Sequence, residues 1–148
     1  MDEVVTLTYD IATHEKDKPK ADISIITDYD QRYLGIISKI FYKDLPSWND
    51  KSGYDLNDIL ARGGHIAAYW ERMRLVGAAV WEQTDDGNWQ LLHICLKFKL
   101  QRRGHGRIFM DYVIHKIQET SPQGKLTAVV PIKNIIGIKF LEKCGFIQ

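Results

Sequence analysis

The chain has 148 residues with 20 basic and 19 acidic side chains, which gives a net charge of +1 at neutral pH. This length fits one domain that can bury a core without a metal or a disulfide. Cys95 and Cys144 lie in apolar segments without metal-ligand spacing, so we expect buried free thiols and no metal. No stretch approaches the ~20 apolar residues of a membrane span, and the N-terminus is acidic rather than basic. The sequence therefore predicts a cytoplasmic domain with no membrane partner.

The first half of the chain predicts two strands and two helices. A charged stretch from His14 to Lys20, which contains Pro19, indicates a loop. It separates an N-terminal arm, residues 1–20, from the main domain, residues 21–148. Strands are expected over 3–9 and 22–27. A helix follows that is capped by Asp28 and ended by Pro46, and a short helix around Leu56 stops at Gly63. The first of these helices has one apolar face, made of Tyr33, Ile36, Ile37, Ile40 and Phe41.

The second half predicts four more strands and two longer helices. The strand over 89–97 is apolar almost throughout, which favours a central position in a sheet. Strands are expected over 65–70 and 74–83, and a hairpin turn over 85–88 leads into the strand over 89–97. A strand over 125–130 is broken by Pro131, and a last helix over 135–144 lies between Asn134 and Gly145. Before them, a helix runs from Gly106 to about Thr120 and is expected to bury Phe109, Met110, Val113, Ile114 and Ile117.

The stretch from Gly87 to Met110 contains no acidic residue, which indicates either an anion-binding surface or a solvated basic face. Within it, Gly104 and Gly106 allow a tight turn and a close backbone approach to a ligand. The helix that follows presents free amides and a positive dipole end, which bind phosphate oxygens. No Walker loop is present, and a dinucleotide fingerprint would need glycine at Phe109. The basic residues of this stretch are Lys97, Lys99, Arg102, Arg103 and Arg107, with His105.

Two motifs resemble those of the GNAT superfamily of N-acetyltransferases. Gln101, Gly104 and Gly106 match the signature Gln/Arg-x-x-Gly-x-Gly/Ala after the apolar strand. Asn134 and the segment from Phe140 to Phe146 match the family's second motif, an Asn followed by a helix that ends in Phe/Leu-Glu-Lys-x-Gly-Phe. The resemblance runs from about Asp22 to Phe146.

This resemblance implies an α+β fold of three α/β/α layers around a mixed, mostly antiparallel sheet. Its fourth and fifth strands, here 89–97 and 125–130, are expected to splay apart. The chain stops where a sixth strand would begin, so this strand is missing or supplied otherwise. The arm Val4–Tyr9 or a second subunit, as in a homodimer, would replace it.

The resemblance also implies a site for acetyl-coenzyme A as cosubstrate. The loop amides would hold its pyrophosphate, and the strand before the loop would pair with its pantetheine arm. Asn134 would hydrogen-bond the pantetheine end. The residues carried over are Arg102, Arg103, Gly104, His105, Gly106 and Arg107 in the loop and Ile94, Cys95 and Leu96 in the strand.

The catalytic groups of the family are only partly present. Leu141 occupies the position where many members have a tyrosine acid, and Gln90 the position of a common base. His93 is the titratable residue of that strand, so it is the candidate base, with a core or surface histidine as the other interpretation. By strict alternation it would point away from Gln90 unless a bulge intervenes. Glu82 is a weaker candidate.

We therefore expect an acetyl-coenzyme A-dependent N-acetyltransferase that acts on a primary amine of a small molecule, protein or peptide. Acidic residues on the first helices favour a cationic acceptor. A solvated acidic face explains the same residues equally well. The alternative is a catalytically inactive GNAT-fold protein that binds coenzyme A or a protein partner. Nucleic-acid binding is disfavoured, because the cations cluster at one helix start and the net charge is near zero.

Overall fold

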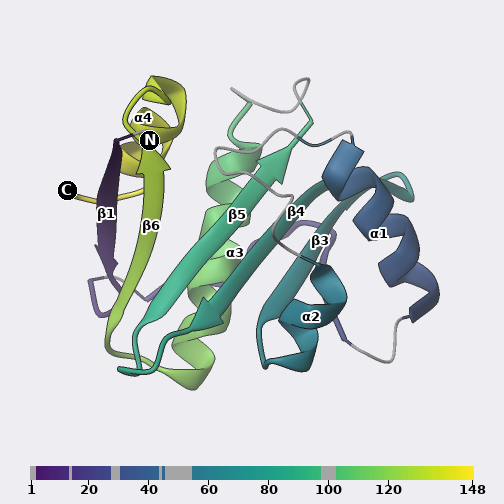
Figure 1. The fold of residues 1–148 in the computed structure, drawn as a ribbon, viewed down its shortest axis with the longest axis horizontal. Helices are drawn as coiled ribbons and strands as arrows, with labels where there is room; N and C mark the ends of the chain where they lie inside the picture. Colours follow the sequence, from purple (N-terminus) through teal and green to yellow (C-terminus); the bar gives the residue numbers. More distant parts are fainter. Residues whose placement is uncertain (1–2, 14, 28–30, 44, 46–54, 98–102) are drawn as a thin grey trace.

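A six-stranded mixed sheet in the order β1-β6-β5-β4-β3-β2 is the framework of the fold (Figure 1). The structure, a computed structural model, describes residues 3–13, 15–27, 31–43, 45, 55–97 and 103–148. Neighbouring strands are antiparallel except β5 and β6, which are parallel. The elements are β1 (Val4–Asp10), β2 (Ile23–Ile26), α1 (Gln31–Lys43), α2 (Leu56–Ala61), β3 (His65–Glu71), β4 (Arg74–Gln83), β5 (Trp89–Leu96), α3 (His105–Thr120), β6 (Lys125–Pro131) and α4 (Ile135–Lys143).

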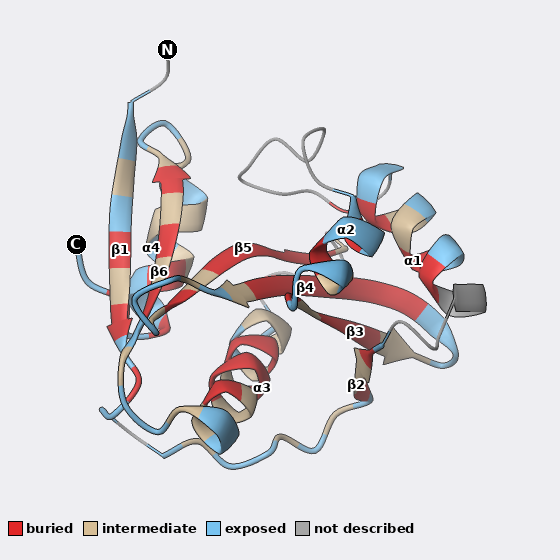
Figure 2. Cartoon of the chain, turned by 60° about the horizontal axis from the view of Figure 1, so that its bottom comes forward, coloured by how far each residue is buried: buried red, intermediate tan, exposed pale blue. Residues whose placement is uncertain are grey.

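Helices cover both faces of the sheet, which gives the expected three layers (Figure 2). Apolar residues of α1 and α2 pack on one face, together with alternate residues of β3, β4 and β5. Apolar residues of α3 and α4 pack on the other face, with β1 and β6. Each face of the sheet therefore has its own core, and the predicted α+β architecture is confirmed.

The helices begin and end where the sequence places local signals, but one residue of α1 was assigned to the wrong face of the helix. Asp55 caps α2, and its carboxylate accepts a hydrogen bond from the Asn57 amide at 2.8 Å. On α1 the prediction was wrong for Ile36, which is 53% exposed, because Leu34 takes the buried position beside Ile37. The expected cap Asp28 and stop Pro46 lie outside the described residues. None of the described helices has the length and apolar character that crossing a membrane requires.

The N-terminal arm provides a strand of this sheet. Every residue of β1 is in register with β6, from Val4 opposite Pro131 to Asp10 opposite Lys125. On its other edge, Thr8 exchanges two backbone hydrogen bonds with Ile147, at 2.7 and 2.9 Å. The N-terminal arm of the same chain therefore covers this edge of β6.

The expected divergence of two central strands is present between β5 and β6. The two strands share only the pairs Trp89–Leu126 and Gln90–Thr127, and beyond them they separate (Figure 1). The part of β5 after Gln90 pairs with β4 on its other side. Beyond Gln90 no described strand pairs with this edge of β5. The strands β5 and β6 diverge toward the end of the sheet where α3 begins, and this divergence is called the gap below (Figure 1).

We predict that the buried face of β1 contributes to stability. Leu7 is fully buried in the core shared with α3 and α4, whereas Val4 on the same strand is 54% exposed. Leu7→Ala should therefore lower the free energy of unfolding by ~2–5 kcal/mol, and the control Val4→Ala should stay within ~0.5 kcal/mol of the parent chain. Urea denaturation measures both. Equal, small effects would mean that β1 is not part of the cooperative core.

Candidate functional site

The edge of β5 that does not pair with β6 after Gln90 forms one wall of the candidate site. Three of its residues, Ile94, Cys95 and Leu96, were predicted to contact a cosubstrate through their backbone, and all three side chains are buried. Ile94 and Leu96 point to the α3 face of the sheet and Cys95 to the α1 face. Because both faces are packed, only the backbone of this segment can be offered to a ligand in the gap.

The turn before α3 is built for close approach of an anion. Gly104 has φ +81°, a left-handed conformation that side chains rarely adopt, and a Cβ there would meet nothing within 4 Å. The Ile108 amide donates to the Gly104 carbonyl at 3.1 Å, which closes the first helical turn. The amides before it, from His105 to Arg107, have no carbonyl of the preceding turn to bind, as at every helix start. The turn thus combines open space with free donors and a positive dipole end.

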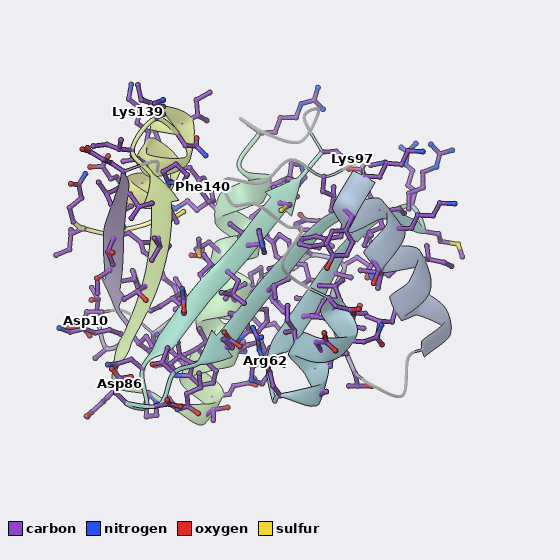
Figure 3. All side chains as sticks on the ribbon, viewed as in Figure 1. Asp10, Arg62, Asp86, Lys97, Lys139 and Phe140 are labelled. Carbon is purple, nitrogen blue, oxygen red and sulfur yellow. The ribbon has the colours of Figure 1, made fainter. Side chains whose placement is uncertain are left out.

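The second glycine of the motif has a different role. A Cβ on Gly106 would lie 2.7 Å from Cε1 of Phe140 on α4. Gly106 therefore lets α4 pack closely against the first turn of α3. Figure 3 shows Phe140 on the α4 side of the end of β5, and Lys97 on the α1 side. Only the glycine at 104 leaves room for a ligand.

Positive charge surrounds this turn. Arg103 and Arg107 are exposed, and Lys97 is half-buried at the end of β5. The nearest acid along α3, Asp111, is paired with Lys16 at 3.4 Å. The predicted contact Arg102 and the motif residue Gln101 lie outside the described residues. The described part of the loop is therefore electropositive, as an anion site requires.

A tyrosine that the sequence did not single out contacts the same turn. The hydroxyl of Tyr69, on β3, lies 2.9 Å from Nδ1 of His105. The Tyr69 ring packs edge-on against Phe109, one helical turn after His105, with ring centroids 5.3 Å apart. Gly77 on β4 lies close to the same cluster: a Cβ there would lie 2.7 Å from the Cys95 carbonyl oxygen and 2.7 Å from Cδ2 of Leu96. Tyr69 and His105 are 36 residues apart, so no local pattern could have shown this pair.

Asn134 stands at the other wall of the gap, where β6 passes into α4. Its side-chain oxygen accepts a hydrogen bond from the Gly137 amide at 2.9 Å, so it caps α4 as predicted. Among the described residues the amide nitrogen of the same side chain has no hydrogen-bond partner, and it can donate. The family role of this residue toward pantetheine stays a prediction.

His93 is turned by a β-bulge. Val80 is in register with His93 and Trp81 with Leu91, so one residue of β5 has no partner on β4. The bulge places His93 on the same face as Gln90, which strict alternation would not allow. The ring is fully buried and packs edge-on against Phe41 of α1, with centroids 5.2 Å apart. The other interpretation of His93 from the sequence, a histidine of the core, accounts for this packing.

The other candidate catalytic positions offer no free group. The carboxylate of Glu82 is held by Arg62 through two hydrogen bonds, at 2.8 and 3.2 Å. Leu141, where many relatives have a tyrosine, is fully buried in the core. Burial raises the pKa of the Cys144 thiol to about 12, so it stays protonated at neutral pH.

The chain belongs to the acetyltransferase (GNAT) family, whose model matches residues 23–146. A search of curated protein sequences found no match. Among solved structures, the chain is similar to an acetyltransferase of Bacillus subtilis in complex with CoA, with 20% identity and a TM-score of 0.65 over 85% of this chain and 76% of that one. It is also similar to a ribosomal-protein-alanine N-acetyltransferase of Brucella melitensis, with 17% identity and a TM-score of 0.60 over 82% of this chain and 89% of that one.

Some similar structures contain considerably more polypeptide. A GNAT-family protein of Novosphingobium aromaticivorans has a TM-score of 0.65 and 13% identity over 99% of this chain, which spans only 60% of that one. All of these identities are low, so the likeness shows the fold. Acetyl-coenzyme A is the family's cosubstrate, and the described residues fit it: a strand edge that β6 leaves after Gln90, for the pantetheine amides, and a basic turn with space at Gly104, for the phosphates.

We predict opposite effects of adding a methyl group at two helical glycines. Gly35→Ala on α1 meets nothing within 4 Å, so it should raise the free energy of unfolding by ~0.5–1 kcal/mol. Gly106→Ala drives a methyl into Phe140 and should lower it by ~1–3 kcal/mol. In a Phe140→Leu background, which makes room, the Gly106→Ala change should become favourable. Urea denaturation measures the sign of each change in the free energy of unfolding. Stabilisation by Gly106→Ala alone would contradict the close packing of α3 and α4.

Proposed function

We propose that this chain transfers the acetyl group of acetyl-coenzyme A to an amine. One observation supports the proposal: β5 parts from β6 after Gln90, and α3, which packs against β5 through Phe109, begins at the left-handed turn of Gly104 with its free amides. A strand edge offers alternating donors and acceptors, which suit the amides of a pantetheine arm. A helix start with flanking arginines suits a pyrophosphate. Membership of the GNAT family supports the same ligand.

The reaction forms a C–N bond to the acceptor and breaks the C–S bond of the thioester. The acceptor must lose a proton, and the thiolate that leaves must gain one. This chain contributes orientation: the edge of β5 and the turn at Gly104 would fix the thioester within the gap, while the capped start of α4 forms the opposite wall. Leu141 supplies no acid, so the proton for the thiolate would come from solvent.

His93 is proposed as the group that takes the acceptor proton. It lies on β5 beyond the last pair with β6, and the bulge turns it to the face on which Gln90 lies. A base must reach its proton directly or through one water. Because Phe41 covers the ring, the acceptor would have to displace this contact when it binds.

The acceptor is proposed to be a primary amine that arrives as a cation. Asp55 and Asp58 are exposed at the start of α2, on the face of the sheet that also carries Gln90. Four more acids of the first half of the chain belong to this expectation but lie outside the described residues: Asp28, Asp30, Asp44 and Asp50. The second candidate function is coenzyme A binding without turnover, which the buried Leu141 favours.

We predict that coenzyme A stabilises the folded chain and that this depends on Gly104. At a hundredfold excess over the dissociation constant, the gain should be about 2.7 kcal/mol. Gly104→Ala should weaken binding by about tenfold or more, because its methyl group fills the open space of the turn. Gly63→Ala is the matched control: Gly63 also has a left-handed φ, of +87°, and nothing within 4 Å, but it lies at the end of α2.

Thermal shift titrated with coenzyme A measures this effect. Both variants carry similar backbone strain, so their melting temperatures without ligand should fall by similar amounts. If the parent chain shows no shift at millimolar coenzyme A, the proposed cosubstrate is wrong. If both variants bind equally, the anion does not lie on this turn.

We predict a pH-dependent defect for His93→Gln. If His93 is the base, turnover should fall about 10²–10⁴-fold with little change in KM for acetyl-coenzyme A. The defect should shrink at high pH, where the acceptor amine is already deprotonated and needs no base. Phe41→Leu, which disturbs the same packing without removing a titratable group, is the control. Parallel, pH-independent losses in both variants would assign His93 to packing alone.

A further inference from the structure

We infer that Tyr69 is a positioning residue that fixes His105 as a hydrogen-bond donor to the phosphates of coenzyme A. This inference rests on the proposed function, since it assigns a role within the same turn. It starts from the contact of the Tyr69 hydroxyl with Nδ1 of His105, 2.9 Å away.

Tyr69 holds the first turn of α3 at two points. Its hydroxyl contacts His105, and its ring packs against Phe109 at an interplanar angle of 88°. These two residues are four apart, so they lie on the same side of the helix. Tyr69 itself is only 6% exposed and sits in the core beneath α3. One side chain of β3 therefore contacts α3 at two positions of its first turn, where the free amides lie.

The hydroxyl also selects which nitrogen of His105 carries the proton. Within the described part of the chain, Nδ1 of His105 is the hydrogen-bond partner of the Tyr69 hydroxyl. Burial, with a smaller contribution from Glu71, raises the pKa of Tyr69, so the hydroxyl keeps its proton. A buried O–H that has one acceptor donates to it. The proton of a neutral His105 ring is then on Nε2, on the side of the ring away from Tyr69.

The same arrangement holds when His105 is charged. Nδ1–H then donates to the Tyr69 oxygen, and Nε2 still carries a proton. In both states Nε2 is a donor, on a half-buried ring at a helix start that also carries the exposed Arg103 and Arg107. An acceptor nitrogen at this point would repel a phosphate oxygen. The tyrosine thus removes the unfavourable tautomer before the ligand binds.

Tyr69→Phe tests this role, because it keeps the ring against Phe109 and deletes only the hydroxyl. Tyr9→Phe is the matched control, since Tyr9 lies in the same core at 3% exposure and its hydroxyl has no hydrogen-bond partner among the described residues. Nitrogen-15 NMR of the histidine rings between pH 5 and pH 8.5, without ligand, reports the protonated nitrogen. Titrations with coenzyme A and with pantetheine, which lacks the phosphates, report binding.

We expect the parent chain to show the Nε2–H tautomer of His105 when neutral, and Tyr69→Phe to show a mixture. Tyr69→Phe should weaken coenzyme A binding by about three- to tenfold, because one hydrogen bond is lost. Pantetheine binding should not change. Tyr9→Phe should leave both affinities and the His105 spectrum as they are. In a His105→Gln background, adding Tyr69→Phe should change the affinity for coenzyme A little, because the amide nitrogen of glutamine is a donor without any selection of tautomer.

Several results would overturn the inference. An Nδ1–H tautomer in the parent chain would show that Tyr69 does not donate. Equal losses of coenzyme A and pantetheine in Tyr69→Phe would mean general damage to the fold. If the parent chain binds pantetheine but shows no preference for coenzyme A, the phosphates do not meet this turn. Absence of all binding would refute the proposed function itself, while the ligand-free spectra would still show whether Tyr69 selects the tautomer.

Discussion

The separation of β5 from β6 after two residue pairs is the constraint on which the rest of the structure depends. A strand in the middle of a sheet normally satisfies its backbone on both edges, and unpaired buried backbone groups are costly. Beyond Gln90, β6 does not pair with β5, so the candidate site offers strand backbone and few functional side chains. This explains why the side chains of Ile94, Cys95 and Leu96 can all be buried while the segment remains a candidate binding wall.

The separation also creates a problem for β6, which keeps little contact with the rest of the sheet on that side. The structure solves it on the other edge, where β1 pairs along the full length of β6 and Ile147 extends the pairing. On the face of the sheet that α3 covers, α4 packs against α3 through Phe140 and Gly106. The two walls of the gap are therefore held apart by packing at their outer sides, and the second glycine of the motif serves this packing.

Most of the fold could be predicted from the sequence because its signals are local. The apolar alternation of β1, the cap at Asn134 and the left-handed Gly145 each act within a few residues, and each is found where expected. The bulge that turns His93 could not be predicted, since it depends on register between β4 and β5. The same holds for Tyr69, whose partners His105 and Phe109 are brought to it by the crossing of α3 over the sheet. Ile36 was assigned to the wrong face because the helix offered Leu34 as an equally apolar neighbour.

Hydrogen–deuterium exchange with and without coenzyme A tests the central claim most directly, because it reads single backbone amides along β5 and at the start of α3. We expect saturating ligand to slow exchange by about tenfold or more at Ile94 and at His105 to Arg107, whereas the Lys97 amide, which already donates to the Val76 carbonyl on β4, should change less. The amides of β3, from His65 to Glu71, should not change. Binding of coenzyme A without protection at the edge of β5 would contradict the account, because the ligand would then lie outside the gap between β5 and β6.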